Sequence, residues 1–199
     1  MNTKLLSYLL LYLFSLVVPE QVFCQSTNFS IQEVKFKSEG VTLAGSVLIP
    51  EKIVSAVVVV HGSDPVKREL DFAKRLAKEG IAVFTYDKRG VGASGGVYVG
   101  PTVGTNNIDT TNLHLLARDA SAAVNVFQSY LKNKKTSIGL VGFSQAGWIM
   151  PIAASQNPKV AFMVLFSCPT ITTLEQLRFQ FLHQWKPGFL GKSYPGRCA

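Results

Sequence analysis

A serine stands between two glycines in the segment GLVGFSQAGWIMP at residues 139–151. An apolar run ends at Gly142, Ser144 follows two positions later, and Gly147 comes three positions after the serine. A serine on a tight turn from a strand into a helix has its Oγ exposed at the edge of a sheet, where it can act as a nucleophile. The same position also suits a serine that merely caps the helix, so this segment alone leaves both interpretations open.

The serine segment departs slightly from the usual nucleophile pattern. The strict spacing is G-x-S-x-A-G, because Ala146 stands where the G-x-S-x-G pattern has its second glycine. Small residues let the strand and helix approach closely, and the turn forces the serine into a strained conformation. Alanine is also small, so we expect the turn to form.

A second segment, VVVVHGSD at residues 57–64, ends a β-branched run with His61 and Gly62. A loop of this kind beside the serine can direct a backbone N–H at the oxyanion that develops during acyl transfer. The two donors would be the N–H groups of Ser63 and of Gln145, the residue after the serine. We expect His61 and Gly62 to support this loop, because the histidine ends a strand one position before the loop glycine.

A third segment, YDKRGVGASGG at residues 86–96, also follows an apolar strand pattern. We expect Asp87 and Arg89 to structure this loop, either by pairing with each other or by binding backbone groups. Gly90 and Gly92 would supply positive φ angles. A phosphate-binding loop is disfavoured, because the segment lacks the Walker pattern and does not lead directly into a helix.

Strand and helix patterns alternate from residue 30 onward. The first two strands alternate apolar and polar residues, and they predict a hairpin that turns at Glu39–Gly40. Alternation with short connections predicts a doubly wound α/β domain with a mainly parallel sheet, whose active site lies outside the carboxyl ends of the strands. The expected strands are 31–38, 41–50, 56–62, 81–87, 137–143 and 160–167, and the expected helices are 67–79, 112–131 and 145–156.

Taken in order, the HG loop, the D-x-R-G-x-G-x-S loop at Asp87–Ser94 and the serine turn resemble the α/β-hydrolase superfamily. The chain most resembles its secreted serine aminopeptidase-like or prolyl-oligopeptidase-like hydrolases and esterases, over about residues 30–175. The resemblance implies a Ser–His–Asp triad with Ser144 as nucleophile, no metal and no cofactor. It also implies hydrolysis of a small-molecule acyl substrate through an acyl-enzyme. Ester, thioester and peptide substrates stay open, with short-chain esters preferred.

The acid and the histidine of such a triad are not identified in the sequence. In the superfamily both follow the nucleophile, and after Ser144 the chain has one acid, Glu175, and one histidine, His183. Both lie in a helical pattern at residues 173–185, where eight positions span about 12 Å, too far for a hydrogen bond between them.

We therefore expect a truncated or frame-shifted hydrolase that lacks the last two strands of its sheet and is impaired in activity. The strand at 160–167 would then be an exposed apolar edge that a partner could cover. His61 and His114 precede the serine, and we expect His114 to lie on the surface at the start of a helix.

Two other function classes remain open at this point. A non-catalytic binding module would keep the fold and lose the triad. A lyase or a perhydrolase-type reaction would reuse Ser144, whereas a dehalogenase is disfavoured because the turn carries serine and not aspartate. A peptidase of the same fold is a third alternative.

The N-terminus has the pattern of a secretory signal peptide. Lys4 precedes an apolar run at residues 5–18, which is shorter than the roughly 20 residues of a membrane span. Small or uncharged residues follow at 22–26, so we expect a signal peptide at residues 1–24 and a secreted or periplasmic protein without a membrane span after its removal. A lipid-anchored Cys24 is the rival interpretation, but the bulky residue before it fits that processing poorly.

The rest of the chain is expected to form one domain at residues 30–185 and an irregular tail at 186–199. The 199 residues carry a formal net charge of +8, yet the basic residues are scattered and no aromatic residues are interleaved with a basic stripe. This pattern predicts no nucleic-acid partner.

Overall fold

The structure is a computed structural model that describes residues 28–99, 110–131 and 135–179. The predicted signal peptide at residues 1–24 and the predicted tail at 186–199 lie outside these ranges. Within the described ranges no helix is long and apolar enough to cross a membrane. All three motifs on which the predicted site depends fall among the described residues.

One sheet contains six strands, which are β1 (Phe29–Ser38), β2 (Val41–Pro50), β3 (Ser55–Val60), β4 (Ile81–Tyr86), β5 (Ile138–Phe143) and β6 (Val160–Phe166). Their order in the sheet is β1-β2-β4-β3-β5-β6. The first two strands form the predicted hairpin, with Glu39 and Gly40 at positive φ in its turn. β2 also pairs with β4 in the antiparallel sense, whereas β4, β3, β5 and β6 run parallel. The predicted doubly wound, mainly parallel sheet is confirmed.

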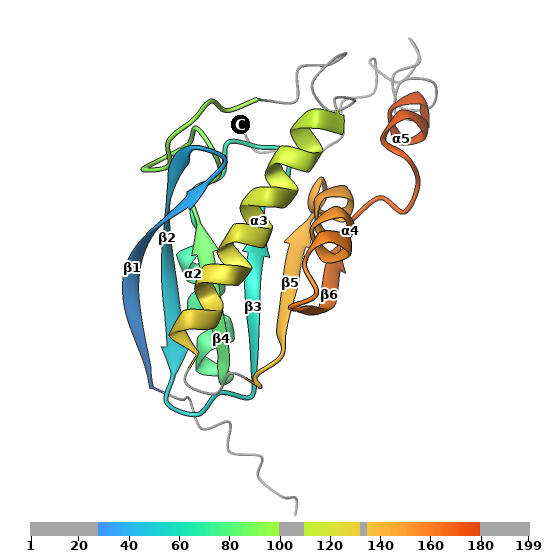
Figure 1. Ribbon diagram of the computed structural model, residues 1–199. Coiled ribbons are helices and arrows are strands. Elements are labelled where there is room, and N and C mark those ends of the chain that lie inside the picture. Colours follow the sequence, from blue (N-terminus) through green and yellow to red (C-terminus); the bar gives the residue numbers. More distant parts are fainter. Residues whose placement is uncertain (1–27, 100–109, 132–134, 180–199) are drawn as a thin grey trace, which may run out of the picture.

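The described helices are α2 (Leu70–Lys78), α3 (Thr110–Tyr130), α4 (Ala146–Gln156) and α5 (Thr173–Phe179). Figure 1 shows α3 and α4 on one face of the sheet and α2 on the other. α2 begins later than the pattern at 67–79 predicts, because hydrogen bonds hold the preceding residues against β4. The Arg68 N–H donates to Asp87 Oδ1 at 2.8 Å. The Glu69 N–H donates to Thr85 Oγ1 at 3.1 Å.

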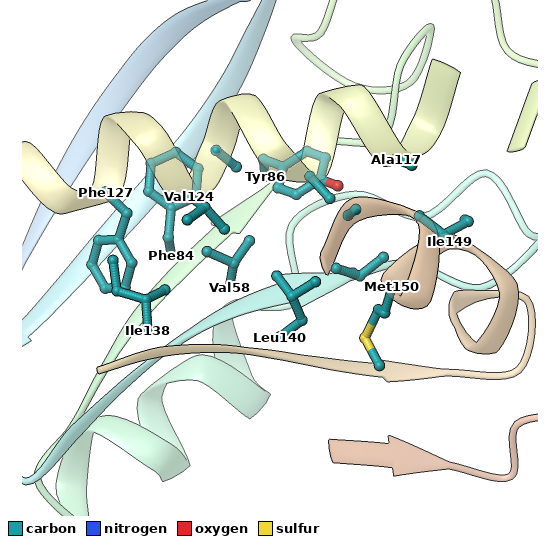
Figure 2. Close-up of a cluster of buried hydrophobic side chains, with 14 of the residues drawn as sticks. Val58, Phe84, Tyr86, Ala117, Val124, Phe127, Ile138, Leu140, Ile149 and Met150 are labelled. Atoms are coloured by element: carbon teal, nitrogen blue, oxygen red, sulfur yellow. The ribbon is translucent and has the colours of Figure 1, made fainter. Parts of the chain in front are cut away.

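The larger of two hydrophobic clusters lies between the sheet and helices α3 and α4 (Figure 2). The rings of Phe84 in β4 and Phe127 in α3 meet edge to face, with centroids 5.8 Å apart. Leu140 of β5 and Met150 of α4 are fully buried in the same cluster. β3 is buried on both faces, as its continuous β-branched run predicts. The buried members of the second cluster, which packs α2 on the other face, are Leu48, Val57, Val59, Ala73, Ala77, Val83 and Val141.

β2 differs from its predicted alternating pattern, because all of residues 43–48 are buried. The strand lies between β1 and β4, and it contributes Val47 to the larger cluster and Leu48 to the smaller one. The polar residue Ser46 is buried as well, and its Oγ donates to Glu33 Oε1 at 2.6 Å. A hydroxyl that keeps a hydrogen bond can occupy an interior position that the alternation assigns to solvent.

β6 forms one edge of the sheet in the described residues. Residues 162–166 are all large and apolar, and each side chain is between 36% and 44% exposed. This is the exposed apolar edge that the sequence predicts. On the opposite edge strand, β1, residues 34, 36 and 38 are buried, and the exposed positions carry polar side chains except at Ile31.

Candidate active site

Ser144 lies at the turn from β5 to α4 and has a φ of 52°. This left-handed conformation costs a non-glycine residue roughly 1–3 kcal/mol and persists only where the surroundings enforce it. The Ser144 N–H donates to the Phe166 carbonyl at 3.2 Å, and the Gly147 N–H donates to the Ser144 carbonyl at 2.9 Å. The N-cap of α4 is Gln145, not the serine, so the structure favours the strained turn over the capping interpretation.

Close packing explains the unusual glycine spacing around the serine. A Cβ on Gly142 would lie 2.4 Å from the Ala146 Cβ and 2.7 Å from the Val60 carbonyl oxygen. A Cβ on Gly147 would lie 2.6 Å from the Cys168 Cβ. The Ala146 methyl therefore occupies the space that Gly142 leaves open, while Gly147 lets α4 approach the segment that follows β6.

The loop after β3 lies directly beside the serine turn. A Cβ on Gly62 would be 3.3 Å from the Phe143 carbonyl oxygen and 3.7 Å from the Ser144 Cβ. The next residue, Ser63, is partly exposed. The structure thus brings together the predicted residues Gly62, Ser63, Ser144 and Gln145 at the carboxyl ends of β3 and β5, where doubly wound folds place their ligands.

His61 lies beneath this loop and is buried. Its Nε2 carries the proton, because it forms a hydrogen bond with the carbonyl of Tyr86, which can only accept. Its Nδ1 has no hydrogen-bond partner among the described residues. Burial lowers the pKa of His61 to about 4, so the imidazole is neutral at pH 7. This placement favours the predicted role of loop support over that of a base for Ser144.

Lys88 is a residue of the site that the sequence patterns did not reveal. It is 3% exposed, and its Nζ donates to the carbonyls of Gly62 at 2.6 Å and Ser63 at 3.1 Å. It also donates to Gln145 Oε1 at 3.2 Å. The Tyr98 ring lies 5.4 Å from this nitrogen, and its hydroxyl donates to the Ser63 carbonyl at 2.6 Å. A lysine in a polar loop is ordinarily exposed, so its position in the sequence gave no reason to place it inside.

Asp87 structures its loop, but it does not pair with Arg89. Its carboxylate accepts from Arg68 Nη2 at 3.0 Å and from the Ala93 N–H at 2.9 Å. Burial would raise the pKa of Asp87, but these hydrogen bonds outweigh burial and lower the pKa to about 2. Gly92 has a positive φ of 58°, and a Cβ there would lie 2.6 Å from Asp87 Oδ2. The loop therefore wraps closely around a carboxylate that stays ionised.

Arg89 pairs with a residue of α3 and not with Asp87. Its Nε donates to Asp119 Oδ2 at 2.9 Å, and its Nη2 donates to Asp119 Oδ1 and to the Ser38 carbonyl. Of the two expected alternatives, backbone binding is correct and mutual pairing is wrong, because each charge has a partner from another element. Gly90 has the expected positive φ, at 71°. The sequence signal for Asp119 is a carboxylate on the mostly apolar buried face of α3.

Glu175 has a structural role at the start of α5. Its N–H donates to Thr172 Oγ1 at 3.3 Å, and its Oε2 accepts from the Thr172 N–H at 3.1 Å and from the hydroxyl at 2.6 Å. This reciprocal pair is a capping box, and its hydrogen bonds lower the pKa of Glu175. His183 lies outside the described residues. His114 is exposed on α3, as expected, with its Nδ1 3.5 Å from Gln156 Nε2.

A profile of the family described as "Serine aminopeptidase, S33" matches residues 51–197, which include the loop after β3, the Asp87 loop and the serine turn. The chain belongs to this family. The resemblance of the three motifs to the α/β-hydrolase superfamily is thereby confirmed. Among curated proteins no relative matches the chain.

Solved structures of α/β hydrolases have the same fold. The α/β hydrolase GrgF from a Penicillium species is 25% identical with a TM-score of 0.58, and the match covers 78% of this chain and 52% of that chain. The Pyrococcus furiosus esterase Pf2001 is 24% identical with a TM-score of 0.55, covering 71% of this chain and 53% of that one. A dienelactone hydrolase from Anabaena variabilis is 22% identical with a TM-score of 0.54, covering 70% and 64%. The chain spans about half the length of the first two of these proteins.

Proposed function

We propose that this protein is a serine hydrolase that cleaves a carboxylic ester, or a related acyl bond, through an acyl-enzyme on Ser144. The observation that carries the proposal is the positive φ of Ser144 on the turn beside the Gly62–Ser63 loop. A nucleophile on a strained turn, next to two backbone N–H donors, is the arrangement that acyl transfer needs. Membership of the serine aminopeptidase family supports the same chemistry.

In the proposed reaction, Ser144 Oγ attacks the acyl carbon while a general base removes the hydroxyl proton. The electrons of the C=O double bond move to oxygen, and the resulting oxyanion accepts hydrogen bonds from the N–H groups of Ser63 and Gln145. When the tetrahedral intermediate collapses, the alcohol leaves with the proton from the base. Water then attacks the acyl-enzyme by the same steps and releases the carboxylic acid.

Labelling with a fluorophosphonate tests the nucleophile directly. We expect the probe to modify Ser144, and we expect Ser144→Ala to lose all labelling while keeping the circular dichroism spectrum of the wild type. Ser155→Ala is the matched control, because Ser155 is an exposed serine on the same helix whose hydroxyl donates to the Ile152 carbonyl. Undiminished labelling of a pure Ser144→Ala sample would contradict the proposal.

The general base is the second element of the proposal. His61 donates from Nε2 to a backbone carbonyl, and the exposed His114 lies against Gln156, so neither described histidine fits this role. We propose that the base lies outside the described residues, where His183 is the one histidine in the printed sequence. We expect His114→Ala to leave the rate of Ser144 labelling unchanged. A loss of labelling in His114→Ala would identify that histidine as the base.

A peptidase is the second candidate function, and the family description favours it. The two candidates share Ser144 and differ in the leaving group. Comparing hydrolysis of p-nitrophenyl acetate with hydrolysis of aminoacyl p-nitroanilides distinguishes them, since a peptidase must also protonate an amine leaving group. We expect the ester to react faster, and preferential cleavage of the anilide would favour the peptidase.

We also propose that residues 1–24 are a signal peptide and that the mature protein acts outside the cytoplasm. The basic start and the short apolar run support this proposal. N-terminal sequencing of exported protein should begin at Gln25, and an intact Met1 would contradict it.

A further inference from the structure

Lys88 joins the two sides of the proposed oxyanion site. Its buried ammonium group has three N–H donors, and the structure gives it three acceptors: the Gly62 carbonyl, the Ser63 carbonyl and Gln145 Oε1. The first two acceptors belong to the loop after β3, and the third belongs to Gln145, the N-cap of α4. One side chain from the loop after β4 therefore connects both segments that carry the proposed oxyanion donors.

The geometry of the peptide bond turns the Gly62 contact into a constraint on Ser63. The Gly62 carbonyl and the Ser63 N–H belong to the same peptide unit, which is planar, and in a trans peptide they point in opposite directions. No peptide bond in the described residues is cis. When Lys88 binds the Gly62 carbonyl at 2.6 Å, it directs the Ser63 N–H away from Lys88.

The same contact also makes the Ser63 N–H a stronger donor. A cation at a carbonyl oxygen draws electron density through the peptide unit, and hydrogen bonds in such a chain strengthen one another in a low-dielectric environment. The Ser63 carbonyl is bound by Lys88 and by the Tyr98 hydroxyl, so the peptide units on both sides of the Ser63 Cα are held. On the other side of the site, the contact with Oε1 holds the side chain of Gln145.

We propose that Lys88 is a positioning residue for the oxyanion hole, which orients and polarises the Ser63 N–H through the Gly62 carbonyl while it fixes Gln145. This inference rests on the proposed function of Ser144. Lys88 itself does not touch the substrate, because its three donors are directed at protein acceptors.

The charge of Lys88 provides a signal that can be followed by pH. Burial lowers the pKa of Lys88 to about 8, and the nearby charge of Asp64 opposes this shift. The other ionisable groups that face Lys88 are His61 beneath the loop and Tyr98 over the ammonium. The pKa of His61 is lowered to about 4, and burial raises the pKa of Tyr98 above its ordinary value of 10.0. Among these groups, therefore, Lys88 is the one that loses its proton between pH 7 and 9, and this loss changes the electrostatic environment of the Ser63 peptide.

Nuclear magnetic resonance tests the coupling without any need for activity. We expect the amide resonance of Ser63 in the wild-type protein to shift with a midpoint near pH 8, the value to which burial lowers the pKa of Lys88. The shift should be absent in Lys88→Met and unchanged in Lys74→Met, which removes an exposed lysine of α2. A Ser63 resonance that does not titrate in the wild type, or that titrates equally in Lys88→Met, would overturn the inference.

The rate of fluorophosphonate labelling tests the consequence for chemistry. We expect Lys88→Met to label Ser144 at least about tenfold more slowly than wild type, with the roughly 10²–10³-fold cost of losing an oxyanion donor as the upper limit. We also expect the labelling rates of wild type and of the control Lys74→Met to fall above pH 8. The labelling rate of Lys88→Met should show no such fall. Equal rates for wild type and Lys88→Met would reject the inference and leave the function of Ser144 intact.

These experiments distinguish failure of the proposed function of Ser144 from failure of the proposed role of Lys88. A wild-type protein that does not label at Ser144 would reject the proposed function, and with it the catalytic role of Lys88. If Lys88→Met does not fold, the wild-type Ser63 titration and the wild-type fall in labelling above pH 8 decide the question. If the wild type shows both the Ser63 titration and the fall in labelling rate, the inference is supported. If either is absent, the inference is overturned.

Discussion

At the scale of single residues, the burial of Lys88 makes stability depend on pH in a predictable direction. Its pKa in the folded protein is about 8, below the roughly 10.4 of a solvent-exposed lysine. Between these values the unfolded chain binds more protons at this group than the folded chain, so its contribution to stability rises with pH. We expect the free energy of unfolding of Lys88→Met, minus that of wild type, to fall as the pH rises from 8 to 10.

Urea denaturation at a series of pH values measures this difference. Lys74→Met is the control, and its difference from wild type should stay nearly constant because the Lys74 side chain on α2 is 43% exposed. A constant difference for Lys88→Met would show that the ammonium is not desolvated in the folded protein.

Gly142 is a second residue whose replacement has a specific expected outcome. A methyl group there would meet the Ala146 Cβ at 2.4 Å and the Val60 carbonyl oxygen at 2.7 Å. We expect Gly142→Ala to lower the free energy of unfolding by about 1–3 kcal/mol and to slow the labelling of Ser144. The double variant Gly142→Ala/Ala146→Gly should recover only part of both, because the contact with the backbone of β3 remains.

Thermal unfolding and labelling rates of the three variants test this packing argument. Ala146→Gly alone should label normally, since glycine stands at this position in the usual motif. Full recovery in the double variant would mean that the Val60 carbonyl is not a constraint.

At the scale of elements, a buried ion pair fixes the loop after β4 to α3. The side chains of Arg89 and Asp119 are 7% and 1% exposed, and the Ser38 hydroxyl donates to Asp119 Oδ1 at 2.6 Å. Removing one partner leaves the other charge buried without compensation, so we expect Asp119→Ala to lower the free energy of unfolding by about 3–5 kcal/mol. Arg118→Gln, which removes the partly exposed partner of Glu39 on the same helix, should cost less than about 1 kcal/mol.

Chemical denaturation of Asp119→Ala and Arg118→Gln makes the comparison within one helix. Equal losses of stability would contradict the view that burial, and not ion pairing as such, makes the Arg89 contact important. Lower labelling of Ser144 in Asp119→Ala alone would show that the loop after β4 also supports the site.

The elements themselves were largely predictable, because each depends on a local pattern. The apolar run at 56–62 and the glycines around Ser144 are readable from neighbouring residues, and the structure has the strand and the turn there. The partners of Asp87 and Arg89 were not predictable, since Arg68 and Asp119 come from other elements, and a carboxylate on the buried face of α3 does not by itself identify Arg89 as its partner. Lys88 was missed for the same reason, because its burial depends on where two distant loops meet.

At the scale of the whole molecule, the two edges of the sheet differ in how they discourage association. β1 presents Lys35 and Lys37 on exposed positions, and charged edge residues of this kind prevent strand addition. β6 presents a continuous apolar run whose side chains are all partly exposed, and α5 stands away from this edge of the sheet (Figure 1). The β6 edge is therefore the surface at which we expect the described domain to associate.

A single charge on β6 tests this expectation. Val164 lies in the middle of the strand and is 39% exposed, so Val164→Lys should change the free energy of unfolding by no more than about 0.5 kcal/mol. It should nevertheless lower concentration-dependent aggregation, because a lysine on an edge strand opposes pairing with another strand. Static light scattering over a concentration series measures the effect. Ile31→Lys places the same charge at an exposed apolar position of β1, and it should have little influence, because that edge already carries lysines. If both substitutions reduce aggregation equally, general net charge and not the β6 edge controls association.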